Sequence, residues 1–432
     1  MNQALEISLA PERLDEGEPE ERAAFGQFTI RSGPMLLTEG SDTFANALRP
    51  GPLVSGYHAA EWFAWNWWRI VCEPYSPRSP DWCRAHTMTA VGEGYLRPDI
   101  TFRTDGVRAA VIARPSSRPD ARPFRFISSN IWFGSTEQMK EAIRTYFIHI
   151  VDRLVEYGIE GSNLQRIVAD IVHERLDPEL AERRRLEALL GRDPDEANDD
   201  AIASLVADAR ELGVAGVDEL AADAAGGIPV RASTLRTIAE AEGIKGRRSD
   251  AARLSAADLT AARQHEVAWR QGRHLAQSLR RKEGLGAAPI GTVRLAAMLG
   301  TSTPDRDKSC GTAPLSFVMN EQEGTTQLVL RSKWDTGRRF ELARLLADQL
   351  LFGADAPILP ATRAYTFRQK VQRAFAAEFL SPFEAVEGML DGDFSSEAIE
   401  EVADHFSVSP VAVETLLRNH GLIERDPLAD AA

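Results

Sequence analysis

The sequence predicts an α+β protein with an aromatic-rich N-terminal α+β domain, a charged helical connector, and a C-terminal helical domain with a small sheet. Three observations lead to this prediction. Asp105-Gly106 lies between two strand-like runs, which favours a hairpin. Six of the eight tryptophans fall within 25–157, which marks that stretch as one domain. The run 338–352 lacks Pro and Gly and is apolar over a wide stripe, as in a helix buried inside a domain.

Composition limits the class of protein. The 432 residues include 50 Lys and Arg against 64 Asp and Glu, a net charge of −14, which argues against a chain that coats nucleic acid over its whole surface. Three cysteines, Cys72, Cys83 and Cys310, are few for this length and indicate a reducing compartment. No apolar run of roughly 18 residues and no basic-then-apolar leader occurs. The sequence therefore predicts a cytoplasmic protein without a membrane partner.

The first domain is expected to follow a tail. Residues 1–24 carry seven acids and few apolar residues, so we expect them to be mobile. Strands are expected over 98–103, 107–112 and 124–132. A helix beginning at Ser135 should continue to about residue 157, where the domain ends.

A tryptophan-rich helix is expected over 56–71. At helical spacing Trp62 and Trp65 share one face with Cys72, Trp68 flanks that face and Trp67 points away. So many large aromatic side chains in one small domain predict a pocket or a partner surface. The candidate binding residues are Trp62, Trp65, Trp67 and Trp68.

Possible metal ligands also occur in this domain. Cys83 and His86 have a ligand-like spacing, but a structural zinc site usually needs two such pairs. Buried thiols in an aromatic core are the alternative interpretation. The weak candidate ligands are His58, Cys72, Cys83 and His86.

A charged helical connector is expected over 158–264. Its acidic segment 193–200 should be solvated, and a short helix over 201–212 should end at Gly213. From 231 to 282 the charge reverses, with twelve basic residues against five acids. This stretch favours an anionic partner, which can be nucleic acid, with Arg247 and Arg248 as contacts. The alternative is that its helices are solvated and neutralise acidic neighbours.

The C-terminal part has a regular order of expected elements. Two helices, 267–285 and 293–300, precede a hairpin formed by 315–319 and 326–332. The chain ends with two helices joined by a tight turn, in which Ser409 caps the second helix and Gly421 ends it. This pair resembles a helix-turn-helix, but its second helix has one arginine, Arg418, and a glutamate, Glu414. Too few cations are present to neutralise phosphates, so packing is the better interpretation.

Two motifs in this part carry a family resemblance. R-R-F-x-L-A begins at Arg338 and is followed, six residues on, by Leu350-Leu351. F-A-A-E-x-L-x-P runs from Phe375 to Pro382. They resemble the zinc helix, and the segment after the third zinc ligand, of the ImmA/IrrE-type metallopeptidases. The resemblance implies a zincin-like domain over 265–423, followed by a tail, 424–432.

The zinc motif itself is degenerate. In that family two histidines at i and i+4 hold Zn²⁺ and a glutamate takes a proton from the metal-bound water. Matching residue by residue puts Arg344 and Asp348 at the histidine positions and Leu345 at the glutamate position. The third ligand would fall between Gln369 and Val371, where no acid occurs. An arginine cannot bind a cation and a leucine cannot accept a proton, so no catalytic residue, metal or other cofactor is expected.

What the resemblance implies is a catalytically inactive regulatory protein. Its expected partner is a helix-turn-helix repressor or a toxin-antitoxin component, in mobile-element, stress or phage-related control. One alternative is an active metalloprotease with non-standard ligands such as Asp348, Glu378, His405 or His420. The other is a DNA-associated transcriptional regulator that uses 231–282.

At the two positions matched to the zinc-binding histidines, the charged side chains of Arg344 and Asp348 can take the place of the metal ion and its ligands. Arg344 and Asp348 lie at i and i+4 of one helix, where opposite charges on one face can meet. We expect them to form a buried ion pair. Glu341, on the same helix, is expected to be exposed.

Overall fold

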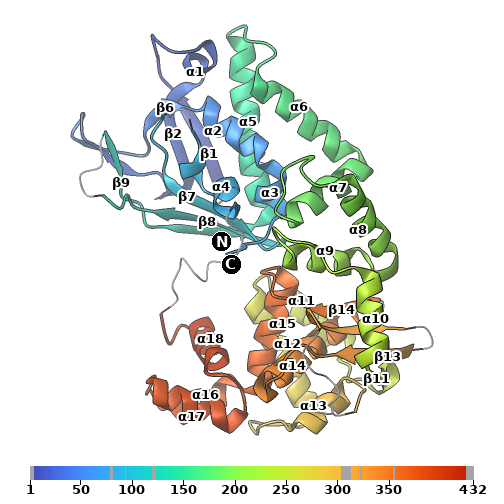
Figure 1. Cartoon of the computed structure of the whole chain (residues 1–432). Helices are drawn as coiled ribbons and strands as arrows, with labels where there is room; N and C mark the ends of the chain where they lie inside the picture. The colour runs from blue at the N-terminus through green and yellow to red at the C-terminus, as the bar shows by residue number, and fades with distance from the viewer. Residues whose placement is uncertain are drawn as a thin grey trace. The chain divides into compact units, whose positions relative to one another are not determined.

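The fold is α+β, with helices and small sheets of antiparallel strands (Figure 1). The structure is a computed structural model that describes residues 4–77, 81–92, 94–118, 123–302, 313–321, 324–353 and 356–424. The chain divides into two compact units, Met1–Ile202 and Ala203–Asp426, called here the N-terminal and the C-terminal unit. None of the helices in the described ranges is long and apolar enough to span a membrane.

The described strands of the N-terminal unit form three sheets. Their orders are β1-β2-β3 with β6 also paired to β2, β10-β8-β7, and β5-β4-β9. The strands are β1 (Leu5–Pro11), β2 (Phe25–Ser32), β3 (Met35–Leu36), β4 (Gly40–Asp42), β5 (Ala47–Arg49), β6 (Leu53–Ser55), β7 (Asp99–Thr104), β8 (Arg108–Arg114), β9 (Phe124–Phe126) and β10 (Ile131–Ser135).

Strand β1 corrects the prediction of a mobile acidic tail over 1–24. It pairs with β2 along its whole length. Leu5, Ile7 and Leu9 alternate along it and are buried, since successive strand residues point to opposite faces. The helix α1 (Pro19–Ala23) follows. The alternation of apolar residues along this segment is itself a strand signal. The acidic composition of residues 1–24 as a whole instead led to the prediction of a mobile tail.

The predicted hairpin around Asp105-Gly106 is confirmed by the pairing of β7 with β8. Gly106 has a φ of +93°, a conformation that glycine adopts without strain. The single strand predicted over 124–132 is wrong. β9 and β10 lie in different sheets, and Ser128, between them, donates a hydrogen bond to the Leu36 carbonyl (2.8 Å). The chain therefore changes sheets within the predicted strand.

The helix predicted from Ser135 is α5, and Ser135 caps it by accepting a hydrogen bond from the Gln138 amide. It packs against α2 and β1 (Figure 1). The tryptophan-rich helix is instead two helices, α2 and α3, separated at Asn66, whose Nδ2 donates to the Trp62 carbonyl (2.9 Å). The helices here are α2 (Tyr57–Trp65), α3 (Trp67–Cys72), α4 (Trp82–His86), η1 (Met88–Ala90), α5 (Thr136–Glu156), α6 (Asn163–Leu176) and α7 (Pro178–Leu189).

The predicted connector over 158–264 is divided between the two units. α6 packs against α2, and α7 against α3, inside the N-terminal unit. The expected solvated segment 193–200 is held there as well: Asp193 pairs with Arg69 (3.2 Å) and Asp195 with Arg184 (2.8 Å). Most of the segment is exposed, as its acidic composition predicts, but buried arginines elsewhere in the unit pair with two of its acids. The predicted boundary at 157 therefore lies within the N-terminal unit.

The C-terminal unit contains a four-stranded sheet in the order β11-β13-β12-β14. The predicted hairpin is confirmed as β12 and β13. The helix predicted over 201–212 is α8, which ends before Gly213. The strands are β11 (Ile244–Arg247), β12 (Ser316–Asn320), β13 (Thr325–Val329) and β14 (Ile358–Ala361). The helices are α8 (Asp199–Leu212), α9 (Val214–Asp223), α10 (Ala232–Glu242), η2 (Arg248–Asp250), α11 (Ala256–Arg263), α12 (Ala268–Lys282), α13 (Thr292–Met298), α14 (Asp335–Phe352), α15 (Phe367–Leu380), α16 (Phe383–Leu390), α17 (Ser396–Phe406) and α18 (Pro410–His420).

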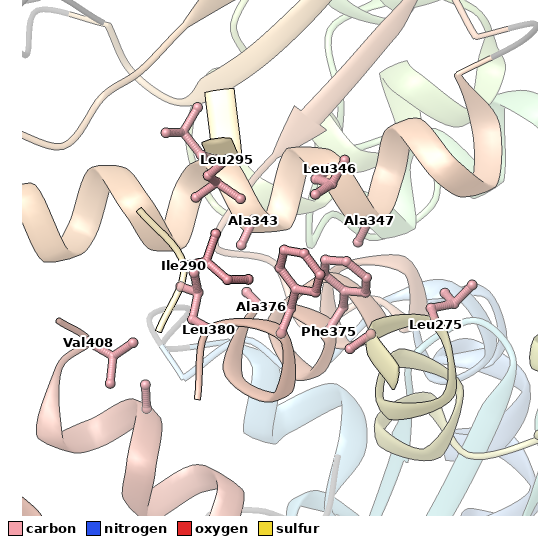
Figure 2. Packing of buried hydrophobic residues seen from close by; sticks show 14 of the residues in the cluster. Leu275, Ile290, Leu295, Ala343, Leu346, Ala347, Phe375, Ala376, Leu380 and Val408 are labelled. Carbon is pink, nitrogen blue, oxygen red and sulfur yellow. The ribbon is translucent and has the colours of Figure 1, made fainter. Parts of the chain in front are cut away.

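The core of this unit surrounds α14, as its wide apolar stripe predicts. Leu342, Leu345 and Leu346 are fully buried. Figure 2 shows Ala343 and Ala347 on the side of α14 that faces α15, where Phe375 and Ala376 lie. Small residues on α14 thus let α15 approach closely.

The two-helix ending is confirmed as α17 and α18. Ser409 accepts a hydrogen bond from the Ala412 amide (3.3 Å), Pro410 occupies the first turn, and Gly421 adopts a left-handed conformation at the end. His420 stacks on Phe383 of α16 with ring centroids 3.4 Å apart. The pair is packed into the unit, as its composition predicts. Of the predicted tail 424–432, all but Glu424 lies outside the described residues.

Candidate functional site

The residues at the predicted zinc position lie inside the core of the C-terminal unit. Arg344, Leu345 and Asp348 on α14 are 7%, 0% and 0% exposed. Charged side chains this deep need partners, because an unpaired buried charge is costly. The partners come from α9, from the segment after β14, and from α15. We call this set of side chains the buried charged cluster: Glu219, Arg344, Asp348, Thr366, Arg368 and Gln369.

Asp348 is bound by Arg368, not by Arg344. The guanidinium donates from Nε to Oδ1 (2.8 Å) and from Nη2 to Oδ2 (2.5 Å), a bidentate pair. This geometry satisfies both carboxylate oxygens, which an arginine one turn away on the same helix does not do as well. The predicted Arg344–Asp348 ion pair is therefore wrong. Arg368 lies in the first turn of α15, and only the tertiary structure brings it to α14.

Arg344 is held by neutral oxygens. Its Nη2 donates to the Thr362 carbonyl (2.6 Å) and to the Gln369 side-chain oxygen. Burial, together with the charge of Arg373, lowers the pKa of Arg344 to about 9. A cation therefore stands at the position predicted for a metal ligand; its Nη2 is held by two oxygens, while its Nε is buried without a hydrogen-bond partner.

Glu219 joins the cluster from α9. It is 5% exposed, and Thr366 Oγ1 lies 2.9 and 2.8 Å from its two carboxylate oxygens. Thr366 also caps α15 by accepting a hydrogen bond from the Gln369 amide (3.2 Å). No local motif in the sequence marks Glu219, and α9 falls within the predicted connector, so the residue was not among the predicted site residues.

Glu219 predicts a pH dependence of stability. Burial raises the pKa of its carboxyl from 4.5 to about 7. The folded state then binds more protons than the unfolded state between these pH values. We expect the free energy of unfolding of the C-terminal unit to fall as pH rises from 4.5 to about 7, and then to level off.

Glu219→Gln should remove this fall, and Glu240→Gln, an exposed change on α10, should keep it. Urea denaturation across this pH range, with hydrogen exchange in α14, measures both. Equal pH slopes for the two variants would contradict the assignment to Glu219. Both variants are expected to share a pH dependence that comes from the N-terminal unit, because burial also raises the pKa of Glu73 there to about 7.

The cluster is poorly suited to metal chemistry. Both oxygens of Asp348 already bind a guanidinium, and Leu345 offers no proton acceptor. Zinc needs three or four lone pairs directed at one point. Among the described residues, no group of three or more His, Cys, Asp or Glu side chains is arranged to hold a metal ion.

The other ligands considered for an active protease do not belong to any group of three or more His, Cys, Asp or Glu side chains that could hold a metal ion within the described ranges. Glu378 is buried and accepts a hydrogen bond from Gln277 (3.1 Å). Burial lowers the pKa of His420 to about 4, and its ring stacks on Phe383. His405 packs edge-on against Phe406 (4.7 Å between ring centroids). Glu378 and His420 thus have partners within the unit, whereas His405 is exposed.

Glu341 differs from its prediction. It is 6% exposed, and its Oε2 accepts a hydrogen bond from the Ser332 amide (2.9 Å). Arg331 lies 3.6 Å from Oε1. The loop before α14 folds over this residue, so a helical face that looks polar in the sequence is covered.

The four weak metal candidates of the N-terminal unit are not brought together. His58 Nε2 lies 3.0 Å from Glu21, Cys83 is exposed and Cys72 is half-buried. His86 stacks on Trp82 (4.1 Å), and burial lowers its pKa to about 3. These contacts indicate separate structural roles. Cys310 lies outside the described residues.

The four candidate tryptophans have different environments. Trp65 is 55% exposed, whereas Trp67, expected to point away, is 3% exposed and packs against Phe147. Trp62 is buried and Trp68 donates to Glu174 Oε2 (2.6 Å). The break at Asn66 changes the phase of the second helix, which a single continuous helix could not predict. Trp65 alone of the four offers most of its surface to solvent.

Replacing Trp67 and Trp65 by alanine should distinguish the buried tryptophan from the exposed one. Trp67→Ala is expected to lower the free energy of unfolding of the N-terminal unit by about 3–5 kcal/mol, because it removes a large core side chain. Trp65→Ala should change it by less than about 0.5 kcal/mol. Urea denaturation of both variants measures the difference. Similar losses in the two would contradict the burial assigned to them.

The basic stretch 231–282 is partly used inside the protein. Arg231 pairs with Asp208 (2.7 Å) and Arg236 with Glu211 (2.5 Å). Arg280 is buried and donates to carbonyl oxygens. Of the two named candidates, Arg247 is exposed on β11 and Arg248 is half-buried in η2. The exposed basic residues are Arg236, Lys245, Arg247, Arg253, Arg263, Arg270, Arg281 and Lys282.

The fold and the buried charged cluster define an α+β protein of two units whose C-terminal unit has a filled, charged core site. No protein-family model, curated protein or solved structure matches the chain. The ImmA/IrrE-type resemblance therefore stays a prediction based on the motifs and their order.

Proposed function

We propose that the protein is a catalytically inactive, ImmA/IrrE-like regulator that binds a partner protein without cutting it. The observation that carries the proposal is the bidentate pair of Asp348 with Arg368 at a predicted metal-ligand position. A carboxylate held in this way is occupied by a guanidinium that the protein itself supplies. With Leu345 at the position of the catalytic glutamate, the helix keeps its core packing and loses the chemistry.

The order of elements gives further support. Helices α12 and α13, the β12–β13 hairpin, α14, α15 and the α17–α18 pair follow in the order that the resemblance implies. The proposed partner is a helix-turn-helix repressor or a toxin-antitoxin component, in mobile-element, stress or phage-related control. We place this activity in the cytoplasm, which agrees with the low cysteine content.

The test uses the full chain and a repressor or antitoxin encoded by a neighbouring gene. We expect no stoichiometric zinc in the purified protein, stable binding of the partner, and an intact partner after incubation with added zinc. The same incubation with a chelator is the control. One zinc per chain that is lost in Asp348→Ala, or cleavage that the chelator abolishes, would overturn the proposal. Failure to bind such partners would remove its regulatory part.

A further inference from the structure

An acidic segment near the end of the N-terminal unit is attached to that unit by ion pairs. We call residues 192–199 the acidic strap; their sequence, Arg-Asp-Pro-Asp-Glu-Ala-Asn-Asp, contains no large apolar side chain. Three acids of the strap pair with three arginines. The pairs are Asp193–Arg69 (3.2 Å), Asp195–Arg184 (2.8 Å) and Asp199–Arg183 (2.7 Å). The attachment of the strap therefore depends on charge and not on buried apolar surface.

These ion pairs lie at the boundary between the unit and the solvent. The side chains of Arg69 and Arg184 are 5% and 8% exposed, whereas those of Asp193 and Asp195 are 40% and 70% exposed. The side chain of Asp199 is 84% exposed. The guanidinium groups are thus covered, but the carboxylates bound to them face water. Ion pairs with such exposed members contribute little individually and are screened by salt.

Each of the three arginines also has a carboxylate partner outside the strap. The pairs are Arg69–Glu73 (2.8 Å), Arg184–Glu174 (2.6 Å), Arg184–Glu187 (2.7 Å) and Arg183–Glu187 (3.1 Å). All three glutamates are buried. An unpaired buried charge is costly, but departure of the strap leaves none of these arginines without an anion.

Glu73 is sensitive to the presence of the strap. Burial raises the pKa of its carboxyl to about 7; Arg69 opposes this shift and the charge of Asp193 adds to it. Departure of Asp193 therefore favours the ionised form of Glu73. That form balances the charge of Arg69 from within the unit.

The strap occupies the part of the chain that leads from one unit to the other. It follows α7 and ends at Asp199, the first residue of α8, just before the last residue of the N-terminal unit, Ile202. While the strap is bound, the chain is anchored up to the start of α8. A detached strap leaves the chain between α7 and α8 without that anchor.

We propose that the acidic strap is a releasable element, which binds its three arginines at low ionic strength and leaves them when the ion pairs are screened. The N-terminal unit stays folded during release, because its own glutamates keep the arginines paired. Release lengthens the unanchored chain between α7 and α8. This property does not depend on the regulatory function proposed above.

Hydrogen exchange in the full chain tests release. It is measured at about pH 8 and at about 0.1 M and about 1 M sodium chloride, between which the Debye length falls from about 10 Å to about 3 Å. The Glu196 amide, bonded to the Asp193 carbonyl (3.1 Å), is one reporter in the strap. We expect strap amides to exchange roughly tenfold faster at the higher salt concentration, while amides of α3 and α7 keep their rates.

Two results with the wild-type chain would overturn the proposal. One is an equal exchange rate of the strap at both salt concentrations. The other is an equal acceleration in α3 and α7, which would mean that the strap leaves only when the unit unfolds. Neither result depends on the folding of a variant.

Asp193→Asn combined with Asp195→Asn removes two of the ion pairs. Its strap should exchange at the lower salt concentration about as fast as the wild-type strap does at the higher one, with little further effect of salt. Asp170→Asn combined with Glu179→Gln removes the same charge from exposed acids outside the strap and should keep the wild-type salt dependence. Wild-type behaviour of the strap variant would contradict the assignment to these ion pairs.

Discussion

Asp348→Ala is expected to lower the free energy of unfolding of the C-terminal unit by about 3–5 kcal/mol, because it strands the buried charge of Arg368. The Arg368 side chain is 10% exposed, and both hydrogen bonds of the bidentate pair would be lost. Urea denaturation, with hydrogen exchange in α14 and α15 to localise the effect, measures the change.

Two further variants make this result specific. Glu414→Ala breaks a half-exposed i,i+4 pair with Arg418 and should cost less than about 1 kcal/mol. Asp348→Leu combined with Arg368→Leu removes both charges and should recover much of the loss. Glu341 is unsuitable as the exposed control, since it is buried. A cost for Asp348→Ala no larger than that for Glu414→Ala would contradict the buried ion pair.

Gly272→Ala is expected to lower the free energy of unfolding of the same unit by about 2–3 kcal/mol. An added Cβ would lie 2.6 Å from the Val371 carbonyl oxygen, 2.7 Å from the Phe375 amide nitrogen and 2.8 Å from Ala374 Cβ. Two of these are backbone atoms of α15, which cannot move away without separating the two helices. The loss should exceed the helix-propensity gain of about 1 kcal/mol that alanine brings.

Gly388→Ala provides the matched control on α16. A Cβ there meets no atom within 4 Å. The substitution should therefore stabilise the protein by about 0.5–1 kcal/mol, through helix propensity and a less flexible unfolded chain. Opposite signs for the two substitutions are the expected result in denaturation experiments. Stabilisation by both would show that α12 and α15 are less tightly packed than the structure has them.

Local sequence signals predicted the elements that depend on neighbouring residues. Asp105-Gly106 gave the β7–β8 turn, and Ser135 and Ser409 marked the starts of α5 and α18. The wide apolar stripe of α14 predicted its burial. These features follow from backbone conformation and from periodicity over a few residues, so the sequence alone contains them.

The sequence predicted where the candidate site lies on α14 but not which side chains form hydrogen bonds and ion pairs there. Sequence motifs placed Arg344, Leu345 and Asp348 together on one helix, and the structure keeps them there. They also suggested that the first and the last form a pair. The carboxylate is instead bound by Arg368, and Glu219 enters from a helix that composition alone had assigned to a connector.

What the sequence by itself determined is the α+β class, the turns and helix starts that carry a local signal, and the residue types at the predicted zinc position on α14. The tertiary structure alone decided which charges meet: Glu219 contacts Thr366, 147 positions along the chain. It also decided that Trp67 is buried. The physical reason is that a buried charge is stabilised by whichever groups the packing of distant segments brings within hydrogen-bond distance, and spacing along the chain does not encode that choice.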